Sequence, residues 1–288
     1  MTQIQQGSGP TALRILLGSQ LRRLREARGL TREEAGHLIR GSESKISRME
    51  LGRVGLRERD VADLLTFYGV EDEEARAAVM DLLARANEPG WWHRFNDLLP
   101  GWFQTYVGLE EAASRIRTYE VQFVPGLLQT REYARAVITA GSAGIAPEEI
   151  ARRVDLRMER QHVLERSDGP FLWAVIDEAA LRRPIGGAEV MRAQLEHLMD
   201  LMHRPDITIQ VMPFSYGGHS AEGGAFSILR FHDEELPDVV YVEQLASALY
   251  LDKREDVDRY GAVMERLCAV STTPDETVDL LKRVIKEI

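Results

Sequence analysis

Cysteine is almost absent from this 288-residue sequence, since Cys268 is the only one. A single cysteine excludes a disulfide framework and a cluster of thiolate metal ligands. Long hydrophobic runs are missing too, because no apolar stretch reaches the roughly 18 residues that span a bilayer. The first residues are rich in Gln, Gly and Ser and do not form a signal-peptide pattern. We therefore expect a cytoplasmic protein without a membrane association.

Familiar catalytic motifs are also missing. The chain has no Gly-x-Ser-x-Gly elbow and no His-Glu-x-x-His pair. The glycine-rich stretch 216–224 lacks the Gly-Lys-Ser/Thr ending of a phosphate-binding loop. His197 and His203 lie six positions apart, which is not a convincing spacing for metal ligands. We therefore expect no enzyme activity and no cofactor, and we assign no catalytic or metal-binding residue.

Charge is present in quantity but is distributed unevenly. The net charge is −10, which by itself argues against binding to nucleic acid. Residues 1–59, however, carry twelve Arg and Lys against six Glu, a net charge of +6, so that the remainder carries −16. A basic first segment and an acidic remainder suit a protein whose first segment meets phosphate.

The basic segment contains the pattern of two short helices joined by a tight turn. Thr31 is a good N-cap, and Glu34 three residues later completes a capping box. Gly41 would supply the positive backbone angle of the turn, and Ser42 would cap the second helix. In that helix, Ile46 and Met49 form the apolar face.

The second helix would then present a short, polar and partly basic face. Arg and Lys can donate to guanine, and Glu can accept from cytosine, in the major groove. An ordinary helical hairpin with a solvated face would show the same spacing. The residues predicted to form the DNA-binding site are Thr31, Arg32, Ser42, Glu43, Ser44, Lys45, Ser47, Arg48 and Arg53.

This segment resembles the phage-repressor (xenobiotic-response-element) helix-turn-helix family. The matching residues are Leu21, Leu24, Arg25, Gly29, Leu30, Thr31, Glu34, Ala35, Ser42, Ile46, Ser47, Arg48, Glu50 and Gly52. The resemblance implies a phosphate contact for Arg32, base-edge contacts for Glu43, Ser44 and Arg48, and positions beside the DNA backbone for Lys45 and Arg53. It also implies that an Arg25–Glu50 pair ties the first helix to the end of the recognition helix. Gly36 and Leu51 depart from the family pattern.

The remainder of the chain indicates an α+β architecture. We expect a flexible tail at residues 1–10, a five-helix DNA-binding domain at 11–88, an aromatic-rich connector at 89–108 and an α+β domain with a mostly antiparallel sheet at 109–288. Within the last domain, apolar periodicity predicts a helix over 109–119 and strands at 171–176, 207–212, 226–231, 239–243 and 247–251.

This larger part resembles the WhiJ-like regulators of filamentous, antibiotic-producing bacteria. The resemblance rests on long motifs such as Trp91-Trp92, 116–120, 124–130 and 181–184. Members pair a repressor-like head with one large C-terminal domain and are described as antitoxin-like. The resemblance therefore implies a small BldB-like partner protein encoded nearby.

Four residues of the α+β domain could form a site for an effector or a partner: Glu178, Arg182, Arg183 and His219. Two neighbouring arginines can clamp a carboxylate or phosphate, although surface arginines beside a hairpin loop would look the same. The sequence thus predicts a transcriptional regulator that binds operator DNA as a homodimer and responds to a small-molecule effector or a small partner protein. The alternative is an antitoxin-like module that neutralises its partner and autoregulates its operon. An enzyme with a DNA-binding head is the third possibility.

Overall fold

The computed structural model describes residues 9–141, 144–232 and 236–288, and these residues divide into two compact units. The helical unit takes in the described residues up to Asn96 together with Phe103–Ala112. The sheet unit takes in Asp97–Trp102, Ala113–Phe231 and Pro237–Ile288. Each unit is described below by itself.

The helical unit is built on five helices, as the sequence predicted for residues 11–88. They are α1 (Pro10–Ala27), α2 (Arg32–Leu38), α3 (Glu43–Glu50), α4 (Glu58–Phe67) and α5 (Glu73–Ala86). A short 3-10 turn at Trp91–Phe95 and α6 (Gly101–Ala112) follow. The core is formed by apolar side chains at helical spacing, among which Leu17, Leu21, Val61 and Leu65 are almost completely buried.

The sheet unit contains one mixed six-stranded sheet in the order β3-β2-β1-β4-β5-β6. Its strands are β1 (Ala113–Glu120), β2 (Phe171–Asp177), β3 (Ile207–Met212), β4 (Phe226–Phe231), β5 (Val239–Glu243) and β6 (Ala248–Leu251). Strands β1, β2 and β3 run parallel, whereas the three pairs from β1 to β6 are antiparallel. Strand β1 therefore lies between the parallel and the antiparallel half of the sheet.

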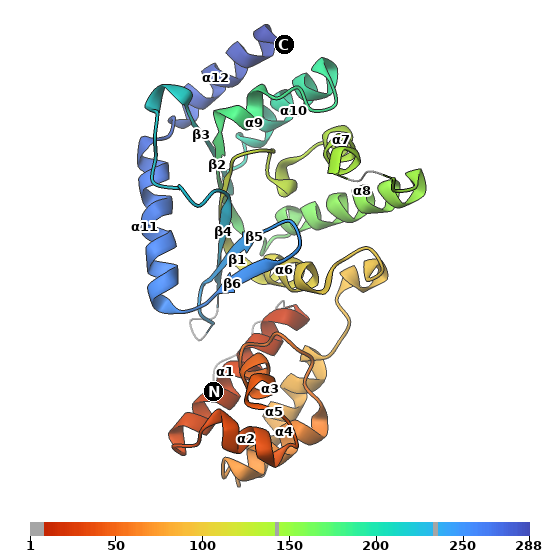
Figure 1. Cartoon of the computed structure of the whole chain (residues 1–288), viewed down its shortest axis with the longest axis vertical. Helices are drawn as coiled ribbons and strands as arrows, with labels where there is room; N and C mark the ends of the chain where they lie inside the picture. Colours follow the sequence, from red (N-terminus) through yellow and green to blue (C-terminus); the bar gives the residue numbers. More distant parts are fainter. Residues whose placement is uncertain (1–8, 142–143, 233–235) are drawn as a thin grey trace. The chain divides into compact units, whose positions relative to one another are not determined.

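Helices cover both faces of this sheet (Figure 1). Helix α11 (Arg254–Val270) lies along one face, where Met264 and Leu267 join a core cluster with Tyr119 and Phe226. On the other side lie α7 (Arg131–Gly141) and α8 (Pro147–Gln161). The remaining helices are α9 (Glu178–Arg182), α10 (Ala188–Leu201) and α12 (Pro274–Glu287). Among the described residues, none of the helices is both long and apolar enough to cross a membrane.

One expectation about an element boundary was wrong. The helix predicted over 109–119 ends at Ala112, and the chain continues as β1, because Ile116 and Thr118 are buried between two neighbouring strands. The tail predicted at 1–10 falls outside the described residues as far as residue 8, and α1 already begins at Pro10. Proline suits this first position because the amide hydrogen that it lacks has no partner within the helix.

Candidate nucleic-acid interface

The first helix of the motif, α2, is fixed at its start by the predicted capping box. The Thr31 hydroxyl accepts a hydrogen bond from the Glu34 amide at 3.2 Å, and the Glu34 carboxylate accepts one from the Thr31 amide at 2.7 Å. The hydrogen bonds that the Glu34 carboxylate accepts from the Thr31 amide and the Thr31 hydroxyl hold the pKa of Glu34 below its usual value. Thr31 is therefore occupied as a cap, and this local geometry follows directly from the spacing of the two residues.

The turn between α2 and α3 differs from the prediction at one residue. Arg40, not Gly41, takes the positive backbone angle, with φ at 52°. The Gly41 amide donates to the Gly36 carbonyl at 2.8 Å and the Arg40 amide to the His37 carbonyl at 3.1 Å, which together form a Schellman motif. In this motif the residue just after the cap is left-handed, and here that residue is an arginine.

Gly36 allows the two helices to approach closely. A Cβ atom at this position would lie 3.0 Å from the carbonyl carbon and 3.1 Å from the carbonyl oxygen of Ser42. Any larger side chain would push the start of α3 away from α2. The departure from the family pattern at residue 36 therefore has a packing reason, which offsets the intrinsic cost of glycine in a helix.

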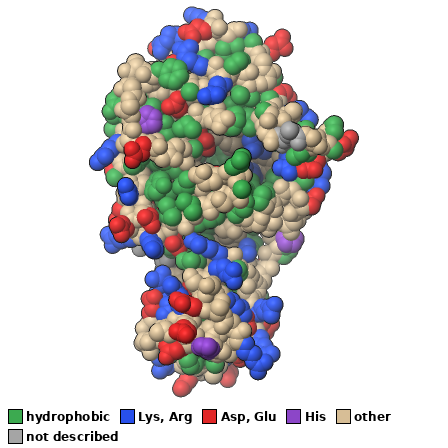
Figure 2. Space-filling view, viewed as in Figure 1, with side chains coloured by type: hydrophobic (Ala, Val, Ile, Leu, Met, Phe, Trp, Pro, Cys, Tyr) green, Lys and Arg blue, Asp and Glu red, His purple; other side chains and the backbone are tan. Residues whose placement is uncertain are grey.

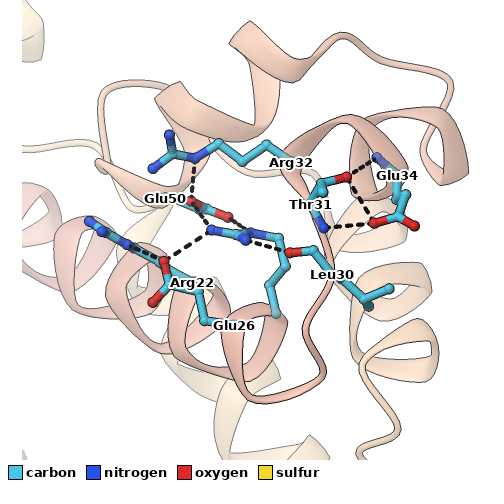
Figure 3. Close-up of polar contacts among 8 residues, drawn as sticks. Arg22, Glu26, Leu30, Thr31, Arg32, Glu34 and Glu50 are labelled. Carbon is cyan, nitrogen blue, oxygen red and sulfur yellow. Dashed lines mark hydrogen bonds and ion pairs between the residues drawn. The ribbon is translucent and has the colours of Figure 1, made fainter.

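The end of α3 is held by a buried ion-pair cluster around Glu50 (Figure 3). Arg25 donates to both oxygens of the Glu50 carboxylate, at 3.1 Å to Oε2, and both side chains are almost completely buried. Arg25 also donates to the Leu30 carbonyl at 2.6 Å. The hydrogen bond that Arg25 donates to the Glu50 carboxylate is the main cause that raises the pKa of Arg25. The predicted tie between α1 and the end of α3 is present.

Arg32 belongs to the same cluster. Its Nε donates to Glu50 Oε2 at 2.9 Å, and about a third of its side chain is exposed. This bond orients the guanidinium, whose two terminal nitrogens make no hydrogen bond among the described residues. Arg32 is thus a positioned donor at the surface, which is compatible with the phosphate contact that the resemblance implies.

The outward face of α3 has the predicted composition. Glu43, Ser44 and Arg48 are exposed, while Ile46 and Met49 are buried against the rest of the unit. Ser42 is exposed but acts as the N-cap, accepting from the Lys45 amide at 3.2 Å. Ser47, on the same helix, is only partly exposed. The structure therefore brings a carboxylate, a hydroxyl and a guanidinium together on one open face.

Lys45 is more constrained than the sequence indicated. Its ammonium group contacts Asp60 Oδ2 of α4 at 2.6 Å, and the Asp60 side chain is mostly buried. Sequence reasoning did not identify Asp60, because the pairing depends on how α4 packs against α3. Arg53, the last residue predicted for this site, is exposed, and its amide donates to the Arg48 carbonyl at 2.9 Å.

The surface of the helical unit combines both signs of charge. Figure 2 shows Lys and Arg side chains beside acidic ones on the visible face of the helical unit. The cations that belong to the motif are Arg32, Lys45, Arg48 and Arg53. Of these, Arg32 and Lys45 contact carboxylates, whereas Arg48 makes no ion pair within the described chain. Arg48 is therefore the cation of α3 whose charge is most available to a ligand.

The second predicted site, in the sheet unit, does not form one cluster. Glu178 is buried, binds Arg182 and accepts from the Phe214 amide at 2.8 Å, so it holds α9 in place. Arg182 also pairs with Glu287 at the end of α12, while Arg183 is exposed. These contacts occupy Glu178 and Arg182 within the fold.

His219 lies in a different group of polar side chains, at the edge of the sheet where the parallel strands end. Its Nδ1 accepts from the Ala221 amide at 3.3 Å, so that the neutral ring carries its proton on Nε2 and donates to the Tyr119 hydroxyl at 2.9 Å. Tyr119 in turn donates to Asp177 at 3.2 Å. Burial is the main cause that raises the pKa of Tyr119 well above its usual range. No group of His, Cys, Asp and Glu among the described residues is arranged to hold a metal ion.

Two family models match the chain. A helix-turn-helix domain model matches residues 16–78, which include α2, α3 and the Glu50 cluster. A model described as a domain of unknown function (DUF5753) matches residues 103–283, which is well over half of the chain and includes all six strands. Neither the curated proteins nor the solved structures contain a match. The chain belongs to the DUF5753 family and carries a helix-turn-helix domain ahead of the family domain.

Proposed function

We propose that this protein is a sequence-specific transcriptional regulator that binds operator DNA through α3. The observation that supports this most directly is that α3 has one buried face and one exposed polar face. Ile46, Met49 and Glu50 fix its inner side, while Glu43, Ser44 and Arg48 remain exposed on the other. A helix with one buried face and one exposed polar face can enter the major groove and contact the base edges.

The protein is proposed to bind as a homodimer. A single head of this size presents only three base-reading side chains, too few for tight specific binding. Two copies whose recognition helices lie one turn of DNA apart would supply the rest. Light scattering on the free protein and on its complex with the upstream region of its own gene tests this. A monomeric mass in both samples would rule the homodimer out.

The DNA contacts can be separated by their response to sequence and salt. Replacing Arg48 with Ala is expected to cost about 1–3 kcal/mol on the operator and to reduce discrimination against mutated sites. Replacing Arg53 with Ala is expected to weaken binding to every sequence alike and to lower the slope of affinity against salt. Fluorescence anisotropy with specific and scrambled duplexes measures both.

The exposed guanidinium of Arg183, in the sheet unit, provides a matched control for this series. Arg183→Ala removes one positive charge without touching the proposed recognition face, and is expected to leave the discrimination between specific and scrambled duplexes unchanged. If the Arg48 and Arg53 variants behaved alike, the proposed recognition face would be wrong. If neither variant changed binding, α3 would not be the DNA-binding element.

The sheet unit is proposed to regulate this activity by binding an effector or a small partner protein. One observation favours a partner: the edge hairpin of β5 and β6 exposes two large apolar side chains, Leu245 completely and Leu249 by about half. An edge strand with unpaired backbone groups and exposed leucines can accept another chain. The antitoxin-like alternative makes this interaction the main task, with DNA binding serving autoregulation.

The leucine pair can be tested with the product of the adjacent gene. Replacing both Leu245 and Leu249 with Ser is expected to weaken its binding in calorimetry, while the double variant keeps its operator affinity. If the wild-type protein gave no heat with that gene product, the partner proposal would fail and only the effector proposal would remain.

A further inference from the structure

A pocket of about 240 Å³ opens in the sheet unit between the sheet and α11. One wall is formed by Arg115 and Arg117 of β1 and Arg230 of β4. The facing wall is formed by α11, with Asp258 and Glu265 among its lining residues. The pocket thus has a cationic wall and an anionic wall, and it involves none of the residues discussed above.

The strand geometry dictates the cationic wall. Residues 115 and 117 are two positions apart and therefore point to the same face of the sheet. Arg230 is the direct partner of Arg115 across the β1–β4 ladder, so three guanidinium groups meet on one face. Like charges placed opposite each other are destabilising in a sheet, which makes this arrangement costly unless something compensates for it.

One of the three arginines is compensated within the fold. Arg230 binds Asp238 through two nitrogens, at 2.8 and 2.9 Å to Oδ2. Arg115 and Arg117 make no ion pair within the part of the chain that the structure describes. They lie over aromatic rings instead, each with its guanidinium carbon 5.8 Å from a ring centroid, Arg115 over Phe171 and Arg117 over Trp173.

Arg117 gives the strongest single indication of a binding site. Its Nε is buried and has no hydrogen-bond partner. A buried donor without an acceptor costs free energy that a bound oxygen would recover. The guanidinium lies beside the thiol of Cys268. Burial raises the pKa of this thiol, and Arg117 offsets only part of the rise. A neutral thiol is a weak acceptor and cannot replace a carboxylate.

The anionic wall follows from the helical period. Asp258 and Glu265 are seven residues apart and so lie on one face of α11, two turns from each other. Gly261 and Ala262 lie between them and leave room, because a Cβ atom added at Gly261 would meet no atom within 4 Å. Asp258 makes only a loose contact with Arg254, at 3.6 Å between largely exposed side chains.

We propose that this pocket binds a small zwitterion of the amino-acid class, with its carboxylate on Arg115 and Arg117 and its ammonium group toward Asp258 and Glu265. The planar forks of the two arginines match a carboxylate, while the two acidic side chains opposite match an amine. The same acidic side chains disfavour a phosphate, which carries more negative charge and no cation. The apolar stretch formed by Ile228 and Val257 suits a short hydrocarbon body.

Ligand binding to this pocket does not depend on DNA binding. That the ligand acts as an effector rests on the proposed regulatory function. The test therefore measures ligand binding on the full chain without DNA. If the protein did not bind operator DNA, the proposed function would be contradicted, but the proposal that this pocket binds a ligand would not be affected. Absence of ligand binding would contradict the pocket and leave the recognition helix untouched.

The experiment is a thermal-shift panel of the twenty common amino acids, with succinate and inorganic phosphate as comparators, followed by calorimetry on the best ligand. At least one amino acid is expected to raise the melting temperature and to bind more tightly than either comparator. A bound ligand is also expected to slow alkylation of Cys268 by iodoacetamide, because its carboxylate neutralises Arg117 beside the thiol.

Three variants locate the binding. Arg115→Gln and Arg117→Gln are each expected to weaken binding about tenfold or more, since each removes a charge-assisted contact. Gly261→Leu, a change that α11 tolerates, is expected to abolish binding by filling the pocket. Arg259→Leu is the matched control on the same helix, because Arg259 is exposed and does not line the pocket. It is expected to bind like wild type.

Three outcomes would overturn the proposal. The first is that no amino acid binds the folded wild-type protein. The second is that succinate or phosphate binds more tightly than every amino acid, which would leave the anionic wall without a role. The third is that binding survives in both the Arg117→Gln and Gly261→Leu proteins, which would place the ligand elsewhere.

Discussion

The Glu50 cluster of the helical unit and the charged residues along β1 of the sheet unit differ in how completely they are paired within the chain. In the helical unit, the buried carboxylate of Glu50 receives hydrogen bonds from Arg25 and Arg32, so that charge and donors balance inside the protein. In the sheet unit, Arg115 and Arg117 have no carboxylate partner among the described residues. At the other end of the same strand, burial and then the nearby carboxylate of Glu243 raise the pKa of Glu120 to about 7.

The charges are balanced within the chain in the Glu50 cluster but not along β1. The Glu50 cluster is satisfied internally and fixes the end of α3 against α1. The charges along β1 are not satisfied in this way, and unsatisfied charges gather at sites of binding and switching more often than in structural cores. Three predictions test whether the contrast holds.

The largest effect is expected from Glu50→Gln. The change removes the buried carboxylate from Arg25, whose remaining acidic contact is the half-exposed Glu26 at 3.3 Å, and losing one member of a buried ion pair costs about 3–5 kcal/mol. Hydrogen exchange followed by mass spectrometry should locate the loss in the peptides of α1 and α3. Glu26→Gln is the control, because Glu26 is half exposed and its pairs are worth at most about 1 kcal/mol. Equal losses in both variants would remove the distinction between the two units.

The second effect is a pH dependence in the sheet unit. Glu120 keeps its proton to about pH 7 when folded but loses it near 4.5 when unfolded, so the folded state binds more protons between these values. Stability therefore falls as pH rises through this window, by roughly 1–2 kcal/mol for this partly exposed side chain. Urea unfolding at several pH values measures the slope.

Glu120→Gln should remove that slope, and Glu243→Gln should reduce it by taking away the repelling charge. Arg157 is a third charged neighbour and lowers the pKa of Glu120, so Arg157→Gln should steepen the slope. A slope that persists unchanged in the Glu120 variant would assign the pH dependence to another group.

The smallest effect concerns the C-terminal end of α2. Gly29, Gly52 and Gly69 follow α1, α3 and α4 with positive φ, whereas Arg40 has this role after α2. Arg40→Gly is expected to raise stability by about 1 kcal/mol, because glycine takes the left-handed conformation without strain. Thermal unfolding measures it. A lower melting temperature would show that contacts of the Arg40 side chain stabilise the fold by more than its left-handed backbone conformation destabilises it.

Local chemistry explains why the helix-turn-helix could be predicted from the sequence. The Thr31 capping box and the Ser42 cap involve atoms three residues apart, so the sequence contains all the information that they need. The choice between Arg40 and Gly41 as the left-handed residue was wrong, because it depends on the residue at which α2 stops. Glycine composition alone does not reveal that position.

Distant contacts explain what could not be predicted. The apolar residues from 109 to 116 fit a helical period, and only pairing with β2 and β4 identifies Ala113–Glu120 as a strand. A helix over 109–119 would not place Arg115 and Arg117 on a common face with Arg230. The Lys45–Asp60 contact was missed for a similar reason, since it joins two helices separated by a loop.

The position of β1 between the two halves of the sheet also has a consequence for biosynthesis. Thr118 bonds to the carbonyl of Phe226, which lies 108 residues further along the chain. At translation rates of about 5–20 residues per second, β4 is synthesised on the order of 5–20 s after β1, and one edge of β1 remains unpaired during that time. The helices before it can form from nearby contacts while the ribosome is still working. The nascent chain therefore carries an incomplete sheet during synthesis, and its yield in the cell should depend on chaperones that shield that edge.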